Sequence, residues 1–236
     1  MIDITGKPLA SMYFMQIVWG LRKEPFIGVR PLNHAKEAPT TGAWQFTNAI
    51  DSWSWQGYEG EKAVVEVYAN SASVRLLLNG KEIANKPVKK YKTLFKLPYQ
   101  PGTLTAEALD ERGNVISSHS LTTAGEETVL RVTPDKMVLC ANNQALCYLP
   151  IEFTDKAGNL KPYMEQRVEV AVAGAATLAG FGSALCKTNE VFDKPYHHSY
   201  RGRCLAVLRA GSTPGKAKVT VTSAGMEPVT IEVEVQ

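Results

Sequence analysis

The sequence predicts a mainly β protein: two β-sandwich domains in tandem, preceded by a short segment that contains one helix. Two observations support this prediction. From residue 62 onward, short extended runs are separated by turn residues about every 8–12 positions, as in all-β sandwiches. The last run, "PVTIEVEV", alternates strictly between apolar and polar residues, which is typical of a strand with one buried face.

The N-terminal segment contains the stretch with helical periodicity. Within "LASMYFMQIVWGLRKEP", apolar residues recur three and four positions apart, and Pro25 closes the run. This spacing predicts a helix of about three turns over 11–21. The helix is apolar over most of its surface, so we expect another surface to cover it. The following "PFIGVRPLN" is expected to form a strand.

The first strand-rich block spans residues 62–124. Its clearest signal is "SVRLLLNGKEIAN", which places Asn79 and Gly80 between two extended runs and so predicts a β-hairpin. A second turn is predicted at 110–114. Five to seven short strands in this block indicate an immunoglobulin-like sandwich.

The second block runs from 125 to 236 and also reads as an immunoglobulin-like sandwich. Turn residues cluster at 155–159 and at 210–215. Between Gly182 and Arg203 the chain has no periodicity, which predicts a long loop. Loops of that length are usually functional or packed on their own side chains.

The overall charge indicates neither a nucleic-acid partner nor a membrane partner. The formal net charge is +3, and no apolar run reaches the length of a membrane span. The densest basic patch is expected to be a solvated hairpin tip and consists of Lys86, Lys89, Lys90 and Lys92. The first residues lack the basic and apolar regions of a signal peptide, so the sequence leaves the compartment open.

The four cysteines do not form a recognisable metal or redox motif. None of them has C-x-x-C spacing, and we expect buried thiols in strands rather than disulfides or a zinc site. His197 and His198 are adjacent, and neighbouring residues rarely bind one ion together, so we expect them to pack the long loop. The sequence therefore predicts no metal and no cofactor.

Aromatic residues gather in "WQFTNAIDSWSWQGYEG", residues 44–60, which holds three of the four tryptophans. Trp44, Trp53, Trp55 and Tyr58 could form a buried packing cluster or an exposed platform for stacking sugars. Spacing does not separate the two, but the segment directly precedes the first sandwich strand, where a linker must become rigid. We favour packing and keep carbohydrate contact as the alternative.

The long loop is the second candidate site. It combines aromatic side chains with an arginine, a composition found in sugar-binding loops and in interfaces. The residues singled out are Phe181, Phe192, Tyr196, His197, His198, Tyr200 and Arg203.

Four stretches carry a resemblance to one family: "DITGKPLASMYFMQIVWGLRKEPFIGVRP", "DSWSWQGYEGEKAVVEVYANSASVRLLLNGKEI", "LRVTPDKMVLCANNQALCYLPIEFTDKAGN" and "GAATLAGFGSALCKTNEVFDKPYHHSYRGRCLAVLRAG". They resemble glycoside hydrolase family 2, the family of β-galactosidase-like enzymes. The first resembles the last strand–helix edge of the catalytic barrel, and the second is similar to the first accessory sandwich after it. The last two are similar to the start and the end of a later sandwich. The resemblance implies a barrel-end remnant and Trp-rich linker at 1–58, a sandwich at 59–124 and a second sandwich at 125–236.

The resemblance also implies that the chemistry lies elsewhere. Family members use two glutamates on barrel strands, held about 5 Å apart in retaining enzymes. Both positions lie upstream of the matched residues, and no residue here corresponds to either. The search for catalytic motifs agrees: Glu126 and Glu127 are adjacent at a strand entry, and no nucleophile elbow, H-E-x-x-H or phosphate loop occurs.

We therefore expect a non-catalytic accessory region that supports the catalytic barrel of a carbohydrate-metabolising enzyme and fixes domain or subunit packing. The parent enzyme would be periplasmic or secreted. The alternatives are a carbohydrate-binding module with glycans as partners, a free-standing hydrolase, and an adhesin-type array. Where no barrel covers it, the 11–21 helix is expected to fold onto the first sandwich or to drive self-association.

Overall fold

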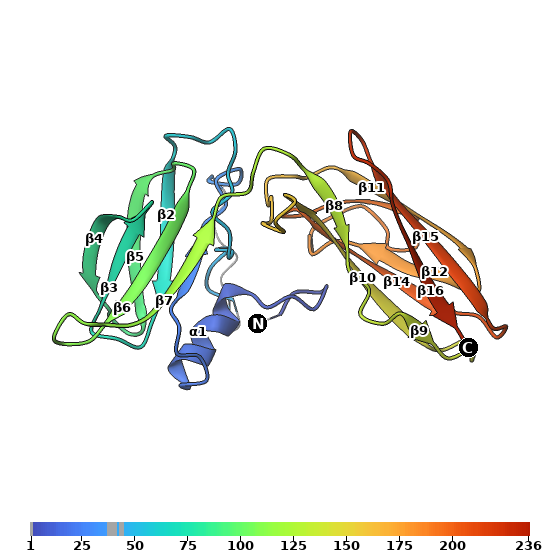
Figure 1. The fold of residues 1–236 in the computed structure, drawn as a ribbon, viewed down its shortest axis with the longest axis horizontal. Coiled ribbons are helices and arrows are strands. Elements are labelled where there is room, and N and C mark those ends of the chain that lie inside the picture. The colour runs from blue at the N-terminus through green and yellow to red at the C-terminus, as the bar shows by residue number, and fades with distance from the viewer. Residues whose placement is uncertain (1, 37–41, 43–44) are drawn as a thin grey trace. The chain divides into compact units, whose positions relative to one another are not determined.

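The computed structural model describes residues 2–36, 42 and 45–236, and in these the protein is mainly β with one short helix (Figure 1). The chain divides into two compact units, Met1–Ala124 and Gly125–Gln236. Each unit contains two sheets, so the predicted tandem sandwich architecture is confirmed. Trp44 lies outside the described residues.

The first unit is a sandwich of a three-stranded and a four-stranded sheet. Alternate side chains of its strands are buried, the pattern of two sheets packed face to face. All neighbouring strands are antiparallel. In order across each sheet the strands are β1 (Phe26–Val29), β2 (Lys62–Tyr68) and β5 (Lys92–Pro98), then β4 (Lys81–Pro87), β3 (Ser73–Leu78), β6 (Thr103–Leu109) and β7 (Val115–Thr122).

The N-terminal segment is built into this sandwich. β1 lies in the part of the chain that resembles a barrel edge, yet it pairs with β2 in the register Phe26↔Tyr68. α1 (Ala10–Val18) packs beside them: the ring of Tyr13 stacks on Phe26 at 4.4 Å and the ring of Phe14 meets Tyr68 edge-on at 5.3 Å. As a result β2 is buried on both faces over most of its length.

The helix is shorter than the predicted 11–21 and begins one residue earlier. It ends in a Schellman motif, in which the N–H groups of Gly20 and Leu21 donate to the carbonyls of Ile17 and Gln16 at 3.1 and 2.8 Å. Gly20 adopts φ +70°, which glycine takes at little cost. Trp19 and Leu21 therefore leave the helix and are 62% and 73% exposed.

Two tight turns of this unit have a left-handed backbone, one in the β3–β4 hairpin and one in the connection from β4 to β5, which lie in different sheets. Asn79 (φ 52°) and Gly80 (φ 76°) form the predicted turn between β3 and β4, where Leu78 pairs with Lys81. The turn between β4 and β5 has the same left-handed backbone at Lys90 (φ 50°) and Tyr91 (φ 63°), but neither residue is glycine or asparagine. Left-handed φ costs an ordinary residue on the order of 1 kcal/mol, so this second turn is strained.

The second unit is a sandwich of four and five strands around one core. Its sheet partners are antiparallel except for β9 and β16, which are parallel. The first sheet contains, in order, β12 (Ala176–Gly182), β14 (Arg203–Ala210), β10 (Leu146–Thr154) and β8 (Val129–Val132). The second contains β13 (Tyr196–His198), β11 (Arg167–Gly174), β15 (Gly215–Ser223), β16 (Val229–Val235) and β9 (Val138–Leu139).

Two sequence expectations for this unit are corrected. The long loop between Gly182 and Arg203 contains the short edge strand β13, whose pairing with β11 has no periodic signal because it is only three residues long. Burial of all four cysteines was expected, but Cys140 and Cys186 are exposed because they lie in loops.

Replacing the strained pair should stabilise the first unit. Lys90→Asn with Tyr91→Gly supplies residues that suit a left-handed turn, and we expect a gain of about 1 kcal/mol in the free energy of unfolding. The reverse exchange at the β3–β4 hairpin, Asn79→Lys with Gly80→Tyr, should destabilise by about 2 kcal/mol. All four tryptophans lie in residues 1–124, so their fluorescence during urea unfolding reports this unit. A loss of stability in the first variant would contradict the assigned strain.

Candidate functional site

The tryptophan segment is part of the interior of the first unit. Trp53 and Trp55 are both 0% exposed. The Trp53 indole N–H donates to the Gln100 carbonyl at 3.0 Å, and its ring meets Tyr99 edge-on with centroids 4.9 Å apart. The backbone N–H of Trp55 donates to the hydroxyl of Tyr99 at 3.0 Å. Neither ring has a free face on which a sugar could stack.

The backbone of this segment is fixed to the end of the first sandwich. The hydroxyl of Thr123 donates to the Trp53 carbonyl at 2.7 Å, and the N–H of Ala124 donates to the Ser54 hydroxyl at 2.9 Å. Tyr58, another candidate, is half-buried, and its N–H donates to the Trp55 carbonyl at 3.0 Å. These bonds fix residues 53–58 to the first sandwich, although they form neither helix nor strand.

A buried carboxylate that the sequence analysis missed lies on β2. Glu66 is 0% exposed. Its Oε1 accepts from the guanidinium of Arg30 and from the hydroxyl of Thr47, both at 2.9 Å. Its Oε2 accepts from the hydroxyl of Tyr68 at 2.8 Å and from the ammonium of Lys92 at 2.6 Å. We call these five residues the Glu66 cluster.

The cluster changes the expected role of Lys92 and the titration of Glu66. Lys92 is not part of a solvated tip, because its ammonium neutralises a buried charge. Burial alone raises the pKa of Glu66, but the bonds from Lys92, Tyr68 and Arg30 outweigh it, so the pKa lies below its usual value. Burial and the adjacent carboxylate raise the pKa of Tyr68 far above its usual range, which keeps its hydroxyl a donor.

Neutralising the carboxylate should destabilise the first unit. In Glu66→Gln the positive charges of Arg30 and Lys92 lose their partner, and we expect a loss of about 2–3 kcal/mol in urea unfolding. Glu107→Gln, which breaks the more exposed Arg75–Glu107 pair, is the matched control and should cost less than about 1 kcal/mol.

The same measurement has a defined pH dependence. The folded state binds a proton at Glu66 less tightly than the unfolded chain does. The stabilisation is therefore present above the usual glutamate pKa and is lost as the pH falls from there through the lower pKa of the folded state. Glu66→Gln should flatten this part of the stability curve. An equal acid dependence in the variant would show that Glu66 is not its source.

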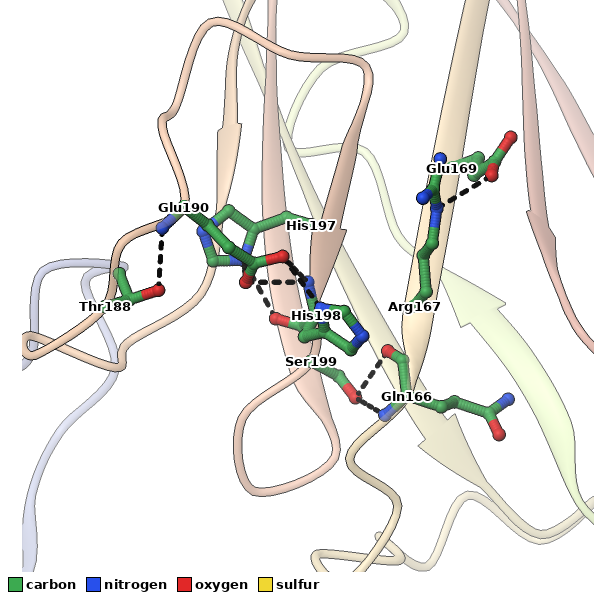
Figure 2. A network of polar contacts seen from close by, with 8 residues as sticks. All are labelled: Gln166, Arg167, Glu169, Thr188, Glu190, His197, His198 and Ser199. Carbon is green, nitrogen blue, oxygen red and sulfur yellow. Dashed lines mark hydrogen bonds and ion pairs between the residues drawn. The ribbon is translucent and has the colours of Figure 1, made fainter.

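The long loop of the second unit is held by one carboxylate (Figure 2). Glu190 reaches β13, where its Oε1 accepts from Nδ1 of His198 at 2.7 Å and its Oε2 lies 3.2 Å from Nδ1 of His197. The N–H of His198 also donates to Glu190 Oε2 at 3.2 Å. The same loop stacks Phe192 on the buried ring of His197, with centroids 5.6 Å apart.

The predicted loop residues do not form one site. Phe181 is buried in the core, with its ring edge-on to His197. Tyr196 is exposed and carries the guanidinium of Arg167 over its ring at 4.0 Å. On the other sheet the guanidinium of Arg203 pairs with Glu152 at 3.0 Å. Tyr200 is half-buried, and its backbone bridges to Arg203.

Removing the charge on Glu190 should loosen the loop. Burial raises the pKa of Glu190, but the bond from His198 and the nearby histidines lower it further, so its carboxylate is stabilised in the fold. In Glu190→Gln we expect hydrogen exchange at the His198 amide to accelerate about tenfold. Glu232→Gln on β16, which breaks the exposed pair with Lys216 on β15, should leave that amide unchanged. Unchanged exchange in both variants would contradict the anchoring role.

The remaining groups with catalytic potential are engaged in the fold. In the described chain the buried carboxylates are Glu66 and Asp155, one in each unit. Asp155 accepts from the N–H groups of Gly125 and Asn159, both at 2.8 Å, in the predicted 155–159 turn. The described residues contain no group of three histidine, cysteine or acidic side chains placed to hold a metal ion. No helix in this part of the chain is long and apolar enough to cross a membrane.

Comparison with known proteins supports a tandem β-sandwich region of larger enzymes. Residues 130–232 match the model for glycoside hydrolase family 2 C-terminal domain 5, and residues 60–117 match a domain of unknown function, DUF4982. The chain is 29% identical over 195 residues to the beta-galactosidase BoGH2A of Bacteroides ovatus, covering 81% of this chain and 23% of that protein.

Solved structures give the same result. A glycosyl hydrolase family 2 member from Bacteroides cellulosilyticus superposes with a TM-score of 0.86 and 26% identity over 100% of this chain and 31% of its own. A beta-glycosidase from Bacteroides vulgatus shares the fold, with a TM-score of 0.76 and 22% identity over 99% of this chain and 27% of its own. These matches identify the chain as a glycoside hydrolase family 2 C-terminal region, which confirms the resemblance found in the sequence. It spans less than a third of the length of these relatives.

Proposed function

We propose that the chain is a non-catalytic accessory region that supports the catalytic barrel of a family 2 glycoside hydrolase of the β-galactosidase type. The observation that carries the proposal is the match of the entire chain to less than a third of a larger family 2 structure. In such an enzyme the two sandwiches contribute rigidity and contact surface, and the barrel supplies the catalytic glutamates. The division at 1–58, 59–124 and 125–236 is part of this proposal.

Rigid attachment of the N-terminal segment supports this role. The buried tryptophans and the Glu66 cluster tie α1, β1 and the 45–55 segment to the first sandwich. If a barrel is joined to this segment, the rigid segment would fix the orientation of the barrel relative to the sandwich. The contacts are apolar packing and buried ion pairs, which resist bending better than a solvated linker does.

An exposed apolar surface beside α1 is the proposed contact for the barrel. Trp19 and Leu21 follow the helix, and Val115 and Ile116 begin β7 at 48% and 55% exposure. The hydroxyl of Ser117 donates to the carbonyl of Lys23 at 3.1 Å, which places the two segments side by side. Contiguous apolar patches of this kind mark interaction sites. The full burial of Trp53 and Trp55 argues against a sugar platform at these two residues.

Two measurements on the isolated chain test the proposal. It should release no chromophore from nitrophenyl β-galactoside or β-glucuronide, because the two glutamates that family members use correspond to no residue of this sequence. Uncovered, its apolar patch should also drive association that grows with protein concentration in sedimentation velocity. Hydrolysis that copurifies with the chain and disappears in Glu66→Gln or Glu190→Gln would overturn the non-catalytic assignment.

Paired variants assign the association to the patch. Trp19→Ser with Leu21→Ser should restore a monomer. Ile83→Ser, which removes another exposed apolar side chain, on β4, is the matched control and should leave the association unchanged. A wild-type chain that stays monomeric at the highest concentration would contradict the proposed contact surface.

A further inference from the structure

A groove of about 600 Å³ opens beside the turn between β4 and β5 in the first unit. Its apolar lining comes from three parts of the chain: Phe14 on α1, Phe46 in the segment before β2, and Pro87 and Leu94 on the two strands. Leu94 is 40% exposed although it belongs to a strand of the sandwich. The groove is distinct from the apolar patch around Trp19 and Leu21, whose residues do not line it.

Four lysines and Thr93 form the rest of the described lining. Lys92 is neutralised by Glu66, and Lys86 donates to the Leu94 carbonyl at 2.9 Å. Lys89 and Lys90 are exposed, and the strained turn that contains Lys90 holds both beside the groove. No carboxylate in the described residues forms an ion pair with Lys86, Lys89 or Lys90. The groove therefore combines an apolar floor with a net positive rim.

The chemistry of the lining favours an acidic peptide over a sugar. Sugar hydroxyls both donate and accept hydrogen bonds, whereas lysine ammonium groups only donate, and Thr93 is the one side chain among the described lining residues that can accept. A ligand with an apolar side chain flanked by carboxylates fits this lining, because the apolar side chain can pack on the floor and the carboxylates can pair with the lysines of the rim. In addition, β5 has a strand partner on one side only within the described sheet, and on its other edge an extended chain can lie beside the Leu94 carbonyl, which Lys86 occupies.

We propose that this groove binds an extended acidic segment of a separate polypeptide. One apolar side chain of the partner would lie against Phe14, Phe46 and Leu94, and its flanking carboxylates would pair with Lys89 and Lys90. Opposite charge accelerates such an encounter, and burial of the apolar side chain slows its release. This interaction goes beyond the accessory role and does not depend on a catalytic barrel.

Fluorescence anisotropy tests the proposal directly. The probe is a fluorescein-labelled ten-residue peptide rich in glutamate with one central phenylalanine, and the protein is the full 236-residue chain. We expect saturable binding that weakens as salt is raised from about 50 to 300 mM. Lys89→Glu with Lys90→Glu should weaken binding at least about tenfold, and Leu94→Gln about fivefold.

Matched controls separate this groove from general charge effects. Lys62→Glu with Lys81→Glu alters the net charge equally, at exposed positions that do not line the groove, and should change affinity less than about twofold. Lys89→Gln with Lys90→Gln gives a milder version in case charge reversal disturbs the turn. The melting temperature of each variant verifies folding.

Four outcomes would overturn the proposal: no saturable binding, equal loss in the control pair, equal binding of a peptide with lysine in place of glutamate, or binding of polygalacturonate in preference to the peptide. The last would assign the groove to an acidic glycan. Self-association of the chain that Lys89→Glu with Lys90→Glu abolishes, while Trp19→Ser with Leu21→Ser does not, would instead assign it to a second copy.

Discussion

The burial of one charge organises the first unit. A carboxylate in the interior is tolerated only when counter-charges and hydrogen bonds replace the lost water. Glu66 obtains them from Arg30 after β1, Thr47 in the tryptophan segment, and Lys92 at the start of β5. These three partners are far apart in sequence, so the charge can be satisfied only when the N-terminal segment is in place. The Glu66 cluster therefore fixes where the N-terminal segment packs on the first sandwich, a position that apolar contacts alone would define less specifically.

In the second unit, too, a carboxylate holds an irregular segment in place, here at the surface. The long loop of this unit has few core residues of its own, and Glu190 holds it to β13 through one carboxylate shared by two adjacent histidines. In both units a single acidic residue fixes a non-repetitive segment on a regular sandwich. This arrangement suits a region whose proposed work is to present fixed surfaces to other parts of an enzyme, because the surfaces lie on segments that would otherwise move.

Local signals in the sequence were sufficient for much of the fold and for little of the site. Asn79 and Gly80 predicted their hairpin because their preference for left-handed backbone is intrinsic. The same left-handed backbone at Lys90 and Tyr91 has no such signal, because neither residue type prefers it. Likewise, nothing near Glu66 in sequence distinguishes it from a solvated strand residue. The spacing of Trp53 and Trp55 fitted both packing and sugar stacking, and their burial became evident only once Gln100 and Thr123 were placed beside them.

The pairing of β1 with β2 has a consequence for how the region is divided. A polypeptide trimmed to start at residue 59 would keep every later strand of the first sandwich but lose the one that covers an edge of β2. That edge belongs to an apolar, β-branched run, the kind of exposed template that pairs with copies of itself. We therefore expect β1 to protect the sandwich from aggregation, and the smallest stable unit to extend upstream of residue 59.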